Sequence, residues 1–199
     1  SDYYEDALMS RVTTVGCRRC GGGLAGAPYI SNVIDGARIA NELDCQLIIF
    51  EGSGATFPPI KTDRRVIVVG ADQPIEYIAG YFGPYRLRLS DLAVLTMCEE
   101  PMVDEVRVRE MEQVVRRVNP ELKVVLTIFR PQPLSDINQK RVFFATTAPV
   151  SMKQTLSDYL EAKYGCKIVG ISHNLSNRKL IRQELAGHRE KYEVLLSEL

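Results

Sequence analysis

Strand, helix and strand follow one another in Asp91–Phe129, "DLAVLTMCEEPMVDEVRVREMEQVVRRVNPELKVVLTIF", and this succession decides the fold class. The aliphatic runs Leu92–Met97 and Val124–Phe129 are short and bounded by turn residues, as in strands buried on both faces. Between them, Asp104–Val118 carries apolar residues on one helical face and charged residues on the other. Two such strands joined by a helix predict a parallel pair that the helix covers.

The same alternation extends toward the N-terminus. Aliphatic runs predict strands at Val12–Val15, Gln46–Glu51 and Arg65–Gly70, and a helix is expected at Asn32–Leu43, where Asn32 and Asp35 form an imperfect capping box. The sequence therefore predicts an α/β fold with a mostly parallel sheet flanked by helices, and it assigns residues 1–130 to this first unit.

A small second α/β unit is predicted for residues 140–199, after the proline-containing boundary Arg130–Gln139. Its expected elements are strand Arg141–Thr146, helix Met152–Tyr164, strand Cys166–Ile171, helix Asn177–His188 and strand Glu193–Leu196. A capping box of Ser151 and Gln154 is expected to begin the first helix, and Gly165 to end it. Its roughly 60 residues are few for an independent core, so we expect it to pack on the first unit or to lack later parts.

Composition excludes several classes of protein. Of the 199 residues, 45% are hydrophobic, and Lys plus Arg equals Asp plus Glu at 25 each, so no overall charge favours nucleic acid or an anionic membrane. No apolar run approaches the ~20 residues of a membrane span, and "SDYYEDALMS" is not a signal peptide. Five cysteines without regular spacing suit reduced thiols, so we expect a cytoplasmic protein.

A Cys-x-x-Cys pair, Cys17 and Cys20, lies in the stretch "VGCRRCGGGLAGAP" and permits three interpretations. Structural zinc requires four ligands, but the only two histidines, His173 and His188, are more than a hundred residues away. A redox pair belongs at a helix start, which three glycines do not favour. The remaining structural alternative is that the two cysteines are small packing residues.

Phosphate binding is the third interpretation of this stretch. Gly21, Gly22 and Gly23 allow backbone N–H groups to approach an anion, and Arg18 and Arg19 supply positive charge. A solvated surface loop with exposed arginines is the alternative.

A second glycine-rich stretch follows the predicted strand Gln46–Glu51. In "LIIFEGSGATFPPIKTD" the strand ends in the carboxylate of Glu51 and runs into Gly52, Ser53 and Gly54. Ligands of parallel α/β sheets bind at the carboxyl ends of the strands, where a carboxylate can hold Mg²⁺ directly or through water. Glu51 is therefore the strongest single candidate, against the alternative of a solvent-facing glutamate.

Four further residues are candidates of lower rank. Arg64 and Arg86 could bind an anion, although "DRR" and "YRLRL" would equally suit a solvated strand edge. His173 and Asn174 follow the predicted strand Cys166–Ile171 and would lie in a ligand-facing loop if that strand is parallel.

Segments along nearly the whole chain resemble the archaeal cyclic 2,3-diphosphoglycerate synthetase family. They are "TVGCRRCGGGLAGAP", "SNVIDGARIAN", "EGSGATFPPIKTD", "GYFGPYRLRLSDL", "RVFFATTAP" and "SHNLSNRKL". The Glu-Gly-x-Gly segment at Glu51–Gly54 also resembles dethiobiotin synthetase, a P-loop protein. The resemblance implies a P-loop-type α/β core and a cytoplasmic, Mg²⁺-dependent ligase that uses ATP to close 2,3-diphosphoglycerate into a cyclic phosphoanhydride.

On this resemblance, specific roles are expected. Glu51 would order Mg²⁺, Gly52–Gly54 with His173 and Asn174 would bind nucleotide, and the acid would be bound by Arg18, Arg19, Gly21–Gly23, Arg64 and Arg86, with Arg19 also acting in catalysis. The sequence holds no G-x-x-x-x-G-K-[ST] motif, which the family carries upstream of the matching region.

We therefore expect a fragment or one part of a split enzyme that is inactive alone and needs the P-loop segment or chain. Self-association into a homo-oligomer is left open. A non-catalytic phosphate-binding regulatory domain and a Cys-x-x-Cys metal or redox module are the alternative functions.

Overall fold

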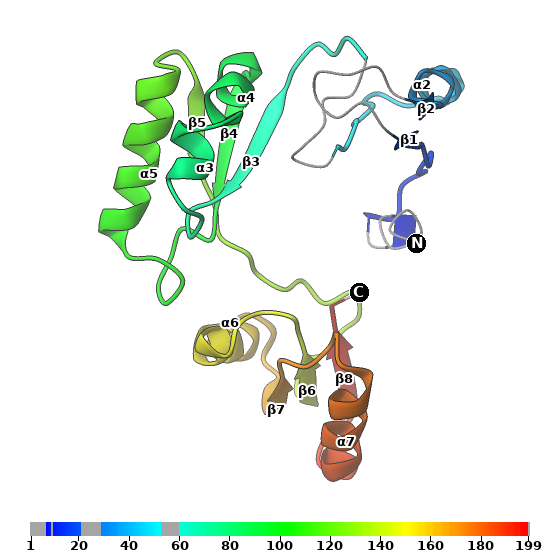
Figure 1. Cartoon of the computed structure of the whole chain (residues 1–199). Coiled ribbons are helices and arrows are strands. Elements are labelled where there is room, and N and C mark those ends of the chain that lie inside the picture. The colour runs from blue at the N-terminus through cyan, green and yellow to red at the C-terminus, as the bar shows by residue number, and fades with distance from the viewer. Residues whose placement is uncertain (1–6, 9, 21–28, 53–59, 199) are drawn as a thin grey trace. The chain divides into compact units, whose positions relative to one another are not determined.

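The computed structural model describes residues 7–8, 10–20, 29–52 and 60–198, and the chain divides into two compact units, Ser1–Asp63 and Arg64–Glu198 (Figure 1). Each unit has its own pairing of strands. No helix among the described residues is both long and apolar enough to cross a lipid bilayer.

The first unit contains one antiparallel strand pair and one helix. Strands β1 (Arg19–Cys20) and β2 (Ile30–Ser31) pair, with Arg19 opposite Ser31. Helix α2 (Val33–Glu42) confirms the predicted helix. The predicted capping box is wrong, because the Asn32 side chain does not cap α2 and instead accepts a hydrogen bond from the Arg18 backbone N–H at 2.6 Å.

Two strands predicted in this unit are absent from the described structure. Residues 12–15 and 46–51 form no strand ladder there. A strand is held by hydrogen bonds to a neighbouring strand, and an aliphatic run does not supply that partner by itself.

Three parallel strands form the first sheet of the second unit, in the order β3-β4-β5. Strands β3 (Val66–Gly70), β4 (Leu92–Thr96) and β5 (Lys123–Leu126) confirm the three predicted strands, although β5 ends three residues earlier than expected. Helix α5 (Glu105–Val118) crosses between β4 and β5 and begins at Asp104, whose side chain accepts from the Arg107 N–H at 2.7 Å.

Two short helices precede β4. Helices α3 (Glu76–Ala79) and α4 (Gly83–Leu89) pack with α5 against one face of the sheet. Arg86 therefore belongs to a helix and not to a strand edge, which corrects the alternative weighed for "YRLRL". The shared core contains Val69, Ile78, Leu87, Ala93, Leu95, Met111, Val114, Val115 and Leu122.

A second sheet of three parallel strands, in the order β7-β6-β8, is formed by the C-terminal residues (Figure 1). Strands β6 (Arg141–Ala145), β7 (Lys167–Ser172) and β8 (Val194–Ser197) confirm the predicted strands within a residue or two. Together with the first sheet they confirm the α/β class with parallel sheets flanked by helices.

Two helices accompany this sheet. A 3₁₀ turn, η1 (Val150–Met152), leads into α6 (Lys153–Tyr164), and α7 (Arg178–His188) follows β7. The predicted capping box at Ser151 is wrong, because that residue lies inside the 3₁₀ turn and no side chain caps α6. Gly165 does end α6, with a left-handed φ of 63°.

Candidate functional site

The carboxyl ends of β6, β7 and β8 meet at one edge of the second sheet, because the three strands are parallel. Such an edge is where open α/β sheets bind ligands. Polar residues leave each strand there: Thr146 and Thr147 follow β6, Ser172 ends β7, and Glu198 follows β8. We call this edge, together with His173, Asn174 and Glu184, the C-terminal polar cluster.

The Glu198 carboxylate joins β8 to the chain that leaves β6. Its Oε1 accepts from Thr146 Oγ1 at 2.5 Å, and its Oε2 accepts from the Thr147 N–H at 2.8 Å and from Thr147 Oγ1 at 3.0 Å. Thr146 Oγ1 also accepts from the Ala148 N–H at 2.9 Å, and the Thr146 side chain is fully buried. With these donors the Glu198 carboxylate is well satisfied, which indicates a structural role.

His173 stands on the loop after β7 in a defined tautomer. Its Nδ1 lies 2.7 Å from the carbonyl oxygen of Ala148, which can only accept, so Nδ1 carries a proton and donates it. In the neutral ring, Nε2 is therefore an acceptor. That nitrogen is buried and has no hydrogen-bond partner among the described residues.

Asn174 connects this loop to helix α7. Its backbone N–H donates to Ser172 Oγ at 3.1 Å, and its side-chain amide donates to Glu184 Oε1 at 2.8 Å. The other carboxylate oxygen, Glu184 Oε2, is buried without a hydrogen-bond partner in the described part of the chain. The cluster thus holds two unsatisfied acceptors, and buried polar atoms in native proteins are normally satisfied by protein, water or ligand.

The carboxyl edge of the first sheet is organised differently. Glu99, which follows β4, forms a salt bridge with Arg130, which follows β5. The distance from Arg130 Nη2 to Glu99 Oε2 is 2.5 Å. The guanidinium also lies 5.4 Å from the ring centre of Tyr159 on α6. The hydrogen bond to Glu99 raises the pKa of Arg130 above its ordinary value. The two charged groups pair with one another at this edge.

Cys98 lies beside this pair. Its Sγ is 3.3 Å from the Leu95 carbonyl oxygen, and burial raises the pKa of the thiol above its ordinary value. A thiol of raised pKa is less often a thiolate, and Cys98 packs against the core of the first sheet.

The residues proposed from sequence in the first unit are only partly described. Arg18 and Glu51 are exposed, and no hydrogen bond or ion pair joins either side chain to another described residue. Arg19 lies in β1. Gly21, Gly22, Gly23, Ser53 and Gly54 lie outside the described residues, and Gly52 is described as exposed chain without helix or strand.

Arg64 and Arg86 lie in the second unit at separate places. Arg64 is exposed and lies 3.9 Å from the Asp91 carboxylate, while Arg86 is half-buried in α4. Of the thirteen residues proposed from sequence, only His173 and Asn174 are adjacent within a described hydrogen-bond network.

Cys17 packs against helix α2. A Cβ added to the buried Gly36 would lie 2.1 Å from Cys17 Sγ, so this thiol fills the space that the missing side chain leaves. In the described ranges no three His, Cys, Asp or Glu residues are grouped as metal ligands. The contact supports the packing interpretation of Cys17.

Glu184 and Glu198 were not predicted from sequence. Glu184 lies in the middle of an amphipathic helix, where a glutamate is ordinarily solvated, and Glu198 follows a short strand. Only the parallel order of the strands brings them to the edge that holds His173, so no local pattern could have indicated them.

Comparison with known proteins gives matches along the whole chain. Residues 1–128 match the model of the P-loop domain of cyclic 2,3-diphosphoglycerate synthetase, and residues 133–199 match that of its C-terminal domain. The chain is 50% identical over 199 residues to the cyclic 2,3-diphosphoglycerate synthetase of Methanothermus fervidus, which covers 100% of this chain and 43% of that protein.

Two further relatives carry the same name. The Rubrobacter xylanophilus protein is 54% identical over 187 residues, covering 94% of this chain and 42% of the relative. The Thermococcus sibiricus protein is 42% identical over 199 residues, covering 100% of this chain and 45% of the relative. The chain therefore spans less than half the length of the curated relatives it matches.

Proposed function

The chain belongs to the cyclic 2,3-diphosphoglycerate synthetase family, and from this premise we propose that it forms part of a cytoplasmic enzyme that converts 2,3-diphosphoglycerate to its cyclic phosphoanhydride at the expense of ATP. The observation that carries the proposal is that two domains of one family match successive parts of the chain, residues 1–128 and 133–199. ATP would supply the free energy of the anhydride bond and leave as ADP and phosphate.

In this proposal Glu51 orders Mg²⁺. Its exposed carboxylate has no partner among the described residues, and Mg²⁺ is commonly held by one or two carboxylates together with phosphate oxygens. The donor type therefore fits the ion. Bound there, Mg²⁺ would neutralise charge that develops during phosphoryl transfer.

Substrate and nucleotide would be bound by different residues. Arg18 and Arg19 with Gly21–Gly23 would hold the multiply charged acid, assisted by Arg64 and Arg86, because charge-assisted hydrogen bonds from arginine suit phosphate and carboxylate. Gly52–Gly54, His173 and Asn174 would contact the nucleotide.

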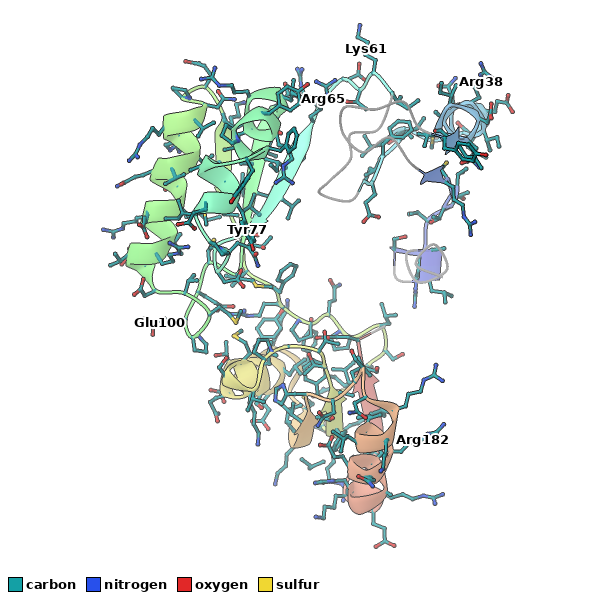
Figure 2. All side chains as sticks on the ribbon, viewed as in Figure 1. Arg38, Lys61, Arg65, Tyr77, Glu100 and Arg182 are labelled. Atoms are coloured by element: carbon teal, nitrogen blue, oxygen red, sulfur yellow. The ribbon has the colours of Figure 1, made fainter. Side chains whose placement is uncertain are left out.

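Steady-state kinetics of a full-length family protein that carries these residues tests the assignment. Arg19→Ala should raise KM for 2,3-diphosphoglycerate and leave KM for ATP nearly unchanged. The loss of a charge-assisted hydrogen bond should weaken binding of the acid alone, by about 1.5–3 kcal/mol. Glu51→Gln should lower kcat at saturating substrate. Arg38→Ala is a matched control, since Arg38 is an exposed arginine of the first unit whose described ion pair is with its helix neighbour Asp35 (Figure 2). Unchanged kinetics in both test variants would refute these roles.

The 199 residues alone should not hydrolyse ATP. The sequence holds no Walker A motif to supply the lysine and the N–H groups that hold the β- and γ-phosphates. Sustained Mg-ATP turnover by the chain alone would contradict this placement of the nucleotide site.

A further inference from the structure

The C-terminal polar cluster contains two acceptor atoms that no described residue uses. His173 Nε2 and Glu184 Oε2 are buried and have no hydrogen-bond partner among the described residues, although the opposite atom of each group is bonded. The bonded atoms fix the ring and the carboxylate in place. The unbonded atoms are therefore buried and held in fixed positions.

Both atoms are acceptors when the His173 ring is neutral. The Ala148 carbonyl requires a proton on His173 Nδ1, which leaves a lone pair on Nε2 of the neutral ring. The Asn174 amide donates to Glu184 Oε1, which orients the carboxylate and leaves Oε2 with its full accepting capacity. A group that satisfies both atoms must be a hydrogen-bond donor.

Charge argues against a phosphate at this place. The cluster holds the carboxylates of Glu184 and Glu198, and no described lysine or arginine pairs with either of them. The basic residues of α7 do not change this, since the side chain of Arg182 is exposed and projects outward from the helix (Figure 2). Two carboxylates would repel a phosphate but would stabilise hydroxyl or amino donors.

We propose that the C-terminal polar cluster binds the nucleoside part of the nucleotide, with His173 Nε2 and Glu184 Oε2 accepting hydrogen bonds from its sugar hydroxyl or base amino groups, and that the cluster does not bind the phosphates. This inference rests on the proposed ATP-dependent function and deepens it. Glu184 becomes a nucleotide-binding residue, while Asn174 is a positioning residue that orients the Glu184 carboxylate.

Equilibrium binding to a full-length family protein that carries these residues tests the inference, with ATP, 2′-deoxy-ATP, ITP and inorganic tripolyphosphate as probes. Glu184→Gln should weaken ATP binding about ten- to hundredfold, the effect of losing one hydrogen bond to a charged group. His173→Asn should weaken it as well, because the asparagine amide can still donate to the Ala148 carbonyl but lacks the Nε2 acceptor. Tripolyphosphate affinity should not change in either variant.

The nucleotide analogues then show which donor is bound. 2′-Deoxy-ATP lacks a sugar hydroxyl and ITP lacks the base amino group, so one of them should bind more weakly than ATP to the wild type and lose little more in Glu184→Gln. Glu190→Gln, an exposed glutamate shortly after α7, is the matched control and should bind every probe as the wild type does. Thermal melting confirms that each variant is folded.

Three outcomes overturn the inference. If both variants bind every nucleotide as the wild type does, the cluster holds only water. If they lose tripolyphosphate affinity, the cluster binds phosphate. If the wild-type protein binds no ATP, the proposed function itself fails. That result differs from the first outcome, in which the wild-type protein binds ATP and the two variants bind it equally well.

Discussion

The two parallel sheets of Arg64–Glu198 have three strands each, but they are covered differently. The central strand of the second sheet is buried throughout from Val142 to Ala145, with α6 on the side of Phe144 and with His188 and Tyr192 against Phe143. In the first sheet the helices cover the face of Val69 and Leu95, while Val66 and Val68 on the other face are 55% and 64% exposed. Similar aliphatic strands thus contribute unequally to the stability of the chain.

The carboxyl edges of the two sheets also differ, in how their polar groups are paired. In the first sheet the edge is closed by the pair of Glu99 and Arg130, whose described charged groups satisfy one another. In the second sheet, His173 Nε2 and Glu184 Oε2 have no hydrogen-bond partner among the described residues. Buried polar atoms that no protein group satisfies are normally satisfied by water or by a ligand.

The largest expected effect is the loss of stability when a buried phenylalanine is replaced, compared with the same replacement at an exposed one. Phe144→Ala in β6 should lower the free energy of unfolding by about 3–5 kcal/mol, because a side chain that is 1% exposed leaves a cavity. Phe129→Ala, the same substitution at a side chain that is 62% exposed, should cost less than about 1 kcal/mol. Chemical denaturation followed by circular dichroism measures both. Equal losses would mean that Phe129 is covered in solution.

The second prediction concerns the ion pair at the first edge. Arg130→Met should cost about 2 kcal/mol, between the values for exposed and buried pairs, because Glu99 would be left unpaired while only 18% exposed. Arg109→Met is the matched control, since its pair with Glu105 is 68% and 79% exposed and should contribute about 0.2–1 kcal/mol at most. The denaturation midpoints of the two variants measure their losses of stability. An equal loss in Arg109→Met and Arg130→Met would refute the predicted difference between the exposed pair and the half-buried pair.

Residues that pack on a regular pattern were predictable from sequence, and those that depend on distant partners were not. Strands β3 to β8 follow aliphatic runs bounded by turn residues, and Asp104 begins α5 as a capping residue should. The runs at 12–15 and 46–51 have similar composition but no described pairing strand, and α4 includes Gly83 and Pro84, which are poor helix formers. His173 could be proposed from sequence because it follows a predicted strand, whereas Glu184 reaches the same cluster only through the fold.

A third prediction compares two threonines at the ends of the central strands. Thr146→Val should cost about 1–3 kcal/mol, because it leaves Glu198 Oε1 and the Ala148 N–H without their partner. Thr96→Val loses only a 3.4 Å bond to the Val69 carbonyl and should cost less than about 1 kcal/mol. Thermal or urea unfolding of the two variants measures the difference. A larger loss of stability in Thr96→Val would contradict the view that the polar network of Thr146 contributes more than the single bond of Thr96.

The smallest expected effect lies at the amino edges, where each sheet has a carboxylate bonded to the backbone N–H at the start of a neighbouring strand. Asp91 accepts from the Arg65 N–H at 2.8 Å, and Glu193 accepts from the Arg141 N–H at 2.9 Å. That backbone bond, together with the Arg141 side chain, lowers the pKa of Glu193 below its ordinary value of 4.5. A lowered pKa in the folded state means that the stabilisation is complete above the ordinary value and is lost as the pH falls through the folded pKa.

Glu193→Gln should therefore reduce stability slightly at pH 7, and its difference from the wild type should shrink as the pH is lowered from about 5 to about 3, where the wild-type carboxylate becomes protonated. Urea midpoints at several pH values measure this. Glu190→Gln, at an exposed position three residues earlier, corrects for the general loss of a negative charge. If the Glu193→Gln difference stays constant over this range, the ionised carboxylate does not stabilise the strand start, because a purely structural amide substitution would have no reason to follow the titration. If it shrinks as expected, the ionised Glu193 carboxylate helps to hold the amino edge of the second sheet.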